Sequence, residues 1–168
     1  MGQTELEHPV ETVDPGLDTA GNDQHDPTLV IDRTARAYHS PVSVSLNHTI
    51  VWCRDQQVSA TFLVEILGRP APVRFGPFLM VAVDNDVSLD FHDIDGDIAP
   101  QHYAFLIGEA DFDAIYGRIV DRGLDHWADP MCSRPREINH NHGGRGVYFP
   151  DPDGHLLEII TRPYGSGG

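Results

Sequence analysis

The chain has 168 residues and a formal net charge of −15, and all 11 basic residues are Arg. The acidity disfavours a nucleic-acid partner, because phosphate binding requires a basic patch, and the lack of Lys excludes lysine Schiff-base chemistry. Because the sequence shows neither a membrane-spanning apolar run nor an apolar leader, we expect a cytoplasmic protein without a membrane partner.

Residues 1–42 differ from the rest of the chain, since they are rich in Asp and Glu and hold few large apolar side chains. We expect an acidic, mostly disordered tail here, with residues 28–38 as a candidate short docked element. Residues 43–165 carry the strand and helix patterns of one domain. This domain divides into a first module over about 43–95 and a second over about 100–165.

In the first module, residues 44–54 are rich in Val, Ile, Thr and Trp, which is typical of a strand. Asp55 is the expected N-cap of a helix over 56–68 that ends at Gly68. Helical spacing predicts a buried face made of Val58, Phe62, Leu63 and Ile66. Further strands are expected at 71–75, 78–84 and 87–93, with a tight turn at Asp84 and Asn85.

The second module repeats this order. A strand is expected over 101–108, then a helix over 109–123 that ends at Gly123. The predicted buried face of this helix holds Phe112, Ile115, Ile119 and Val120. A short strand is expected over 125–130, and strands over 144–149 and 155–161 form a hairpin around the turn at 150–154, with His155 pointing outward.

The order strand, helix, three strands thus occurs twice, and the two copies share specific residues. His48 lies 20 residues before Gly68, and His102 lies 21 residues before Gly123. The last strand of each copy holds one central carboxylate, Asp90 in the first and Glu158 in the second. This repetition predicts an α+β fold in which two βαβββ modules form a curled mixed sheet around a cavity.

Three of these residues suit a metal centre. If the two copies enclose a common cavity, then His48, His102 and Glu158 converge there as two imidazoles and one carboxylate, a ligand set for a divalent metal. The cation would also offset the cost of burying the Glu158 carboxylate. The alternative is that each His is a hydrogen-bonded core residue and that Glu158 pairs with an Arg such as Arg145.

The sequence resembles the vicinal oxygen chelate superfamily, which includes glyoxalase I, bleomycin-binding proteins and type I extradiol dioxygenases. The motifs are "LNHTIVWCRD", "QHYAFLIGEADFDAI" and "GVYFPDPDGHLLEI", and the resemblance runs from Ser45 to Gly165. It implies paired βαβββ modules and a metal held by His48, His102 and Glu158, with Fe(II) favoured over Zn, Mn or Ni. A homodimer is expected, and its paired modules come either from one chain or from swapped halves.

Two branches of the superfamily suggest further site residues. Glyoxalase I has a fourth ligand where Asp90 stands here, so Asp90 is either a distant ligand or holds a water near the substrate. The stretch "INHNHGGRGVYFPDPDGHLLE" resembles the signature of ring-cleaving dioxygenases, which makes His140 and Tyr148 the catalytic groups beside the metal. The further His of those enzymes is replaced here by Val87, with His92 nearby. Asn139 is expected at the cavity mouth.

The function expected from these residues is a metal-dependent enzyme. Its small substrate, which includes catechols in the dioxygenase version, chelates the metal through vicinal oxygens. The alternative is a protein of the same fold that sequesters an antibiotic or aromatic metabolite without catalysis. Members of that class generally lack the complete ligand set, which this chain retains. A plain interaction domain that acts through the acidic tail is the third interpretation.

Overall fold

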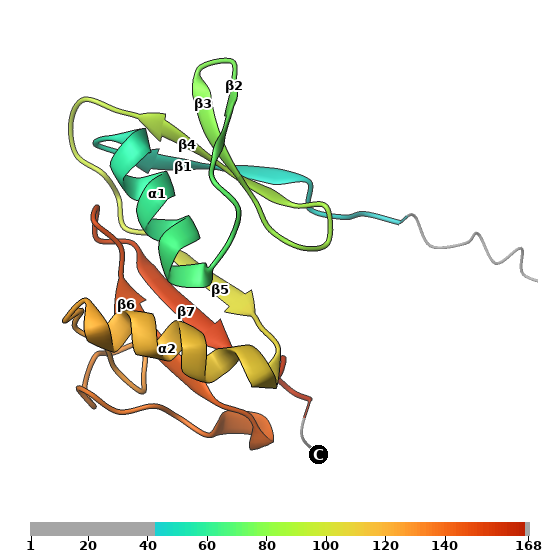
Figure 1. Ribbon diagram of the computed structural model, residues 1–168, viewed down its shortest axis with the longest axis vertical. Coiled ribbons are helices and arrows are strands. Elements are labelled where there is room, and N and C mark those ends of the chain that lie inside the picture. Colours follow the sequence, from blue (N-terminus) through green and yellow to red (C-terminus); the bar gives the residue numbers. More distant parts are fainter. Residues whose placement is uncertain (1–42, 167–168) are drawn as a thin grey trace, which may run out of the picture. The chain divides into compact units, whose positions relative to one another are not determined.

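The computed structural model describes residues 43–166, and the predicted tail and its candidate element at 28–38 lie outside them. The first module consists of β1 (His48–Cys53), α1 (Gln56–Leu67), β2 (Val73–Phe75), β3 (Phe78–Ala82) and β4 (Ser88–Asp93) (Figure 1). Its four strands form one sheet in the order β1-β4-β3-β2. Strand β1 runs parallel to β4, and the other neighbours are antiparallel.

The second module contains β5 (His102–Leu106), the short 3-10 helix η1 (Glu109–Asp111), α2 (Phe112–Asp121), the 3-10 turn η2 (Asn141–Gly143), β6 (Gly146–Pro150) and β7 (Leu156–Ile160). Its sheet has the order β5-β7-β6, in which β5 is parallel to β7 and β6 is antiparallel to it. The fold is therefore α+β with two sheet modules, as the sequence predicts.

The strand predicted over 125–130 is wrong. Only isolated bridges occur there, from Trp127 to Tyr148 and to Pro135. Pro130 has no backbone N–H to donate to a ladder. The side chain of Asp129 also accepts hydrogen bonds from backbone amides that follow it, which turns the chain away from an extended course.

The strand registers of the parallel pair correspond in the two modules. In the first, His48 pairs with Ser88, and Asp90 lies two residues further along the same strand. In the second, His102 pairs with Leu156, and Glu158 lies two residues further along. Each module therefore places a His and a carboxylate on the same face of two neighbouring parallel strands, because residues two apart in a strand share a face.

Helix α1 begins and ends as the sequence predicts. The Asp55 carboxylate accepts hydrogen bonds from the backbone N–H groups of Gln57 at 2.8 Å and Val58 at 3.1 Å, an N-cap that contributes about 1 kcal/mol. Gly68 ends the helix with φ +69, a left-handed conformation that side chains with a Cβ adopt only at a cost. These two residues fix the length of the helix and thereby the start of β2.

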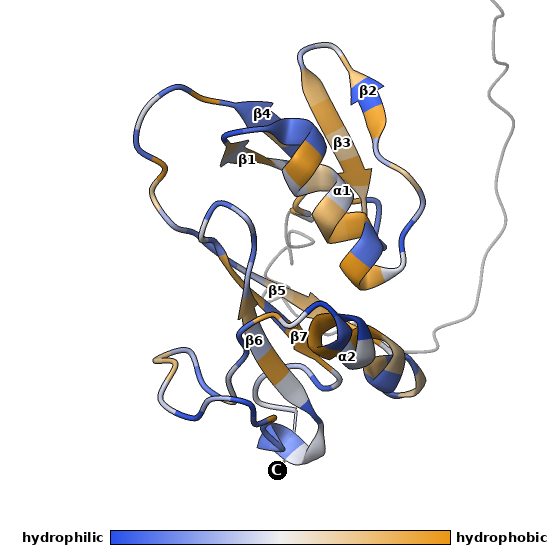
Figure 2. Cartoon of the chain, turned by 60° about the vertical axis from the view of Figure 1, so that its left-hand side comes forward, coloured by the Kyte–Doolittle hydropathy of each residue, from blue (hydrophilic) through white to orange (hydrophobic). Residues whose placement is uncertain are grey.

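The helices cover one face of each sheet, and residues coloured as hydrophobic lie along β3 and on parts of both helices (Figure 2). The predicted buried face of α1 is shifted, because Val58 is exposed while Ser59 and Ala60 are buried. In α2, Val120 is likewise exposed. Both corrections have the same cause: the residue at the rim of an apolar stripe faces water when the sheet covers only part of the helix.

His155 contradicts its predicted outward position, since it is 1% exposed. Its Nε2 donates to the carbonyl of Trp52 at 2.8 Å, and its Nδ1 accepts from the backbone N–H of Gln101 at 2.9 Å. The ring therefore connects the end of β1 to the start of β5. Contacts between the helices also join the modules, such as the hydrogen bond from Arg118 to the carbonyl of Ile66. No helix among residues 43–166 is long and apolar enough to cross a membrane.

Candidate metal centre

His102 and Glu158 meet on the open face of the second sheet. Nε2 of His102 lies 3.3 Å from a carboxylate oxygen of Glu158. Nδ1 of His102 lies 2.9 Å from the carbonyl oxygen of Leu156. A carbonyl can only accept, so Nδ1 carries the proton, and in the neutral ring the lone pair of Nε2 points toward the carboxylate. This is the orientation in which a histidine binds a metal through Nε2.

Glu158 is the most unusual charge in the structure, because its residue surface is 0% exposed. Arg145, the alternative partner weighed above, instead binds Glu109 and Asp113 at the surface. The carboxylate of Glu158 accepts from the hydroxyl of Tyr164 at 2.7 and 2.8 Å. Within residues 43–166 no Lys or Arg side chain makes a hydrogen bond or ion pair with Glu158. The Glu158 carboxylate therefore takes its hydrogen bonds from the phenol of Tyr164, with the His102 ring nitrogen 3.3 Å away.

The pair fits a divalent metal. Two ligands that each lie about 2.1 Å from one ion in adjacent positions are about 3 Å apart, close to the His102–Glu158 separation. One ligand nitrogen is already oriented by a backbone carbonyl, and the carboxylate is buried without a counter-charge. Both properties are typical of a metal site and unusual for a structural pair.

Tyr148 completes this side of the site. It lies opposite Glu158 in the antiparallel pair of β6 and β7, its ring stacks on His102 with centroids 5.8 Å apart, and its hydroxyl lies 2.8 Å from that of Tyr164. Burial first, and then its hydrogen-bonding neighbours Glu158 and Tyr164, raises the pKa of Tyr148 above its usual value. Tyr148 therefore remains a protonated donor at neutral pH.

The predicted residues of the first module lie on the other sheet. The ring Nδ1 of His48 is 2.9 Å from the side-chain oxygen of Asn47, and its Nε2 makes no hydrogen bond to another residue within 43–166. Asp90 is buried and accepts a hydrogen bond from Ser88 at 2.9 Å. His92 packs between the rings of Trp52 and Phe78. No group of three His, Cys, Asp or Glu side chains in residues 43–166 of one chain is arranged to hold a metal, so His48 is not brought to His102 and Glu158.

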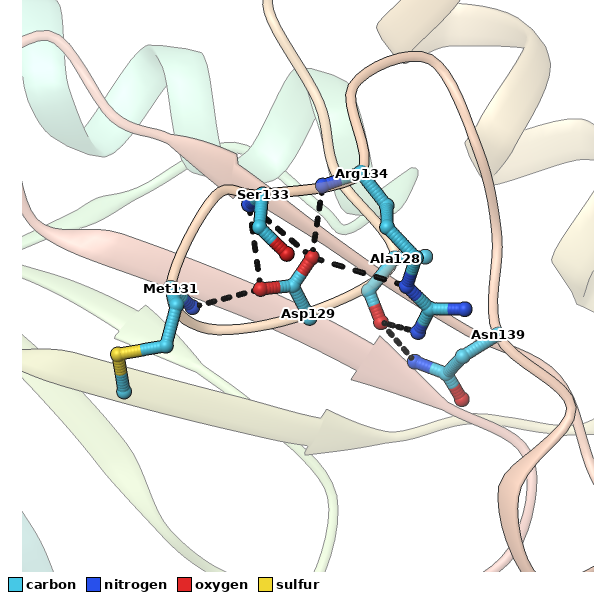
Figure 3. A network of polar contacts seen from close by, with 6 residues as sticks. All are labelled: Ala128, Asp129, Met131, Ser133, Arg134 and Asn139. Carbon is cyan, nitrogen blue, oxygen red and sulfur yellow. Dashed lines mark hydrogen bonds and ion pairs between the residues drawn. The ribbon is translucent and has the colours of Figure 1, made fainter.

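A loop that follows α2 lies beside Tyr148, and Asp129 organises it (Figure 3). The Asp129 carboxylate accepts from the backbone N–H groups of Met131 at 3.0 Å, Ser133 at 3.1 Å and Arg134 at 2.9 Å. Desolvation opposes ionisation here, but these hydrogen bonds outweigh it and hold the pKa of Asp129 below its usual value. The loop is thereby built around one carboxylate, and its Trp127 pairs with Tyr148.

Asn139 serves this loop. Its amide nitrogen donates to the carbonyl of Ala128 at 3.0 Å, and its oxygen accepts from the backbone N–H of Asn141 at 3.2 Å. A Cβ atom added at Gly146 would lie only 2.9 Å from the amide atoms of the Asn139 side chain. The amide of Asn139 is therefore engaged in holding the loop together, which differs from the predicted role at the cavity mouth. His140 is exposed, and its side chain hydrogen-bonds to no other described residue.

Asp129→Ala is expected to loosen this loop without unfolding the domain. The variant leaves three backbone N–H groups without their acceptor, while the core around β6 and β7 is untouched. Amide hydrogen exchange should rise at Ser133 and Arg134. Asp125→Ala, an exposed carboxylate at the start of the loop, is the matched control. Equal protection in both variants would contradict the role given to Asp129.

Acid should act on the same loop. The pKa of Asp129 is depressed in the folded state. Its contribution to the stability of the loop is therefore complete above the pKa that Asp129 has in the unfolded chain, and it is lost as the pH falls through the lower pKa of the folded state. Exchange at Ser133 should therefore be unaffected near neutrality and should rise only in strong acid, in the wild type but not in the variant.

Sequence reasoning missed Tyr164. It follows the last strand, where no period marks a buried face, and only the turn residues of "PYGS" signal an ordered segment. A cleft of about 600 Å³ lined by Arg69 and Arg118 was also not foreseen. None of His102, Tyr148 and Glu158 lines it. The His102–Glu158 pair therefore lies outside this cleft.

Comparison with known proteins identifies the family. A family model described as the Glyoxalase/Bleomycin resistance protein/Dioxygenase superfamily matches residues 45–159. The Glutathione transferase FosA of Serratia marcescens is 33% identical over 122 residues, which cover 68% of this chain and 79% of that protein. The Metallothiol transferase FosB of Shouchella clausii is 43% identical over 60 residues, 36% of this chain and 37% of that one.

Two solved structures are more similar in sequence. Oxidase ChaP-H1 is 65% identical with a TM-score of 0.72, covering 73% of this chain and 99% of its own. Oxidase ChaP-H2 is 60% identical with a TM-score of 0.73, covering 76% of this chain and 100% of its own. The fosfomycin resistance protein FosX of Listeria monocytogenes, in complex with Mn(II) and 1S,2S-dihydroxypropylphosphonic acid, is 19% identical with a TM-score of 0.55, and shares the fold alone.

Proposed function

This chain belongs to the glyoxalase/bleomycin resistance protein/dioxygenase superfamily, and from that premise we propose that it is a metal-dependent oxidase of a small phenolic substrate. The observation that carries the proposal is the His102–Glu158 pair with Tyr148 beside it. Its similarity to two proteins named as oxidases, at 65% and 60% identity, supports the reaction class.

The residues have separate roles in this proposal. Nε2 of His102 and the carboxylate of Glu158 hold the metal, with Fe(II) favoured and Mn, Zn or Ni as alternatives. The ion supplies a Lewis acid and, as iron, a site for dioxygen chemistry. Tyr148 donates a hydrogen bond to a substrate oxygen and keeps its proton, and the carbonyl of Leu156 keeps the His102 ring in its ligating orientation.

Two contacts within the chain support a phenolic substrate group. The hydroxyl of Tyr164 is 2.8 Å from that of Tyr148 and 2.7 Å from Glu158, so a phenol can be accommodated between the two. The polar contacts of His102, Tyr148 and Glu158 within residues 43–166 include no Arg. A phosphonate such as the one bound to FosX would lack a counter-charge from these residues, which favours a phenol over that class.

The third ligand comes from a second copy of the chain. His48 lies on the face of the first sheet that α1 does not cover, and residues 43–166 of one chain do not bring it to His102 and Glu158. A dimer in which the first sheet of each copy covers the second sheet of its partner would unite the three ligands twice. The site is incomplete without that copy.

The exposed surface supports this pairing. The strand registers align Ile50, Asp90, Met80 and Val73 in one row across the first sheet, on the face that also carries His48. Ile50, Trp52, Val73 and Phe75 are exposed large apolar residues there, and Leu106 is exposed on the His102 face of the second sheet. Apolar faces of this kind in a soluble chain are typical of interfaces.

Metal analysis and oxygen consumption test the proposal. Protein purified without chelator should hold about one divalent ion per chain, and after loading with Fe(II) it should consume dioxygen with a catechol or hydroquinone. Tyr148→Phe should retain the metal and lose most of the turnover. The sequestration alternative gains support instead if an aromatic ligand raises the melting temperature of metal-free protein and no dioxygen is consumed.

A further inference from the structure

We propose that Tyr164 is a C-terminal latch on the metal centre. In the metal-free protein its hydroxyl donates a hydrogen bond to the Glu158 carboxylate, and metal binding displaces that hydroxyl. The inference rests on the proposed function, because it takes His102 and Glu158 as ligands. The inference gives a role to Tyr164, which is neither one of the proposed metal ligands nor one of the predicted catalytic residues His140 and Tyr148.

The first observation is that Tyr164 engages both carboxylate oxygens at once. Its O–H lies 2.7 Å from one oxygen of Glu158 and 2.8 Å from the other. Since a carboxylate only accepts, the phenol must be the donor to it, and Tyr148 then donates to the Tyr164 oxygen at 2.8 Å. Tyr164 thus compensates a buried charge that no Arg side chain within residues 43–166 contacts.

The second observation is that a metal needs the same lone pairs. One carboxylate oxygen lies 3.3 Å from Nε2 of His102, which defines the side from which an ion would contact both ligands. A donor equidistant from the two oxygens lies in front of the carboxylate and takes a lone pair from each. A metal bound to Glu158 beside His102 removes the need for that hydrogen bond and competes for its position.

The third observation is that Tyr164 is easily released. In the single chain it is 57% exposed, so little of the apolar contact within the chain is lost when the ring leaves. It lies in a turn closed by the N–H of Ser166 and the carbonyl of Pro163 at 3.2 Å, with Gly165 at φ +77, as in a type II turn. The one aromatic ring beside it within residues 43–166, that of His142, meets it edge-on at 5.7 Å.

These properties differ from those of a structural tyrosine. A residue that only holds Glu158 in place would be packed into the core, as Tyr148 is. Tyr164 instead combines a strong polar contact with a weakly held turn near the end of the chain. The contact is therefore one that a ligand can replace without disturbing β7.

The test compares Mn(II) affinities of metal-free wild type, Tyr164→Phe and Tyr116→Phe by calorimetric titration. Removing a hydrogen bond that competes with the metal should tighten binding about tenfold in Tyr164→Phe. Tyr116→Phe removes a hydroxyl that contacts His126, away from the carboxylate, and should bind like wild type. Unchanged or weaker binding in Tyr164→Phe overturns the latch.

A second readout follows the ring itself. With tyrosine rings labelled by ¹³C and Tyr164 assigned through the Phe variant, Zn(II) should move the Tyr164 signals toward those of a free tyrosine. Signals that stay in place overturn the latch. A His102→Ala arm separates the two proposals: if wild type and His102→Ala bind Mn(II) alike, the metal centre fails, whereas loss in His102→Ala with no effect of Tyr164→Phe rejects only the latch.

Discussion

Glu158→Gln is expected to abolish tight metal binding and, with it, turnover. The substitution keeps the size of the side chain and an oxygen that can accept from Tyr164, but it removes the charge that binds the cation. Loss of a ligand should weaken the metal affinity by more than about a hundredfold, beyond the effect of losing an outer hydrogen-bond partner. Calorimetric titration of metal-free protein with Mn(II) measures this directly.

The loss of metal binding in Glu158→Gln should not be accompanied by a loss of folding stability. Metal-free Glu158→Gln should be at least as stable as metal-free wild type, because the buried side chain is then an uncharged amide in place of a carboxylate. Adding metal should raise the melting temperature of the wild type only, since a ligand stabilises the state that binds it. Glu65→Gln, an exposed carboxylate paired with Arg122, is the matched control. Wild-type metal affinity in Glu158→Gln would reject the candidate centre.

Mixed dimers of His48→Ala and Glu158→Gln chains are expected to regain metal binding that each variant alone lacks. If His48 of one copy completes the site of the other, a mixed dimer has one site with both substitutions and one with neither. Co-expressed chains with two different tags, purified on both, should therefore contain about half the metal of the wild-type dimer. Elemental analysis and dioxygen consumption give the two measurements.

The control for this experiment is a mixed dimer of His102→Ala and Glu158→Gln chains. His102 and Glu158 lie 3.3 Å apart in one chain, so each site of that dimer keeps one damaged ligand. It should bind no metal. Recovery in this control, or no recovery in the His48 mixture, would contradict a site shared between two copies, and a protein that sediments as a monomer would do the same.

Much of the site was accessible from sequence because it depends on local rules. Strand alternation places His102 and Glu158 on one face once their strands are neighbours, and the repeated order of elements indicates that they are. Tyr148 follows from the hairpin around the turn at 150–154, which pairs it with Glu158. The mistakes came where local patterns conflict with long-range contacts, as for His155, whose polar ring is buried between the ends of two strands.

The sequence by itself determined the duplicated α+β fold, the two strand histidines and the carboxylate in the last strand, since these follow from periodicity and spacing. Only the tertiary structure decided which of the candidate ligands meet within one chain. His48 remains apart from His102 and Glu158 because the placement of the two modules depends on contacts between distant residues, such as Arg118 with Ile66 and His155 with Trp52. Tyr164 belongs to the same class: its hydroxyl reaches Glu158 through a turn that has no periodic signal.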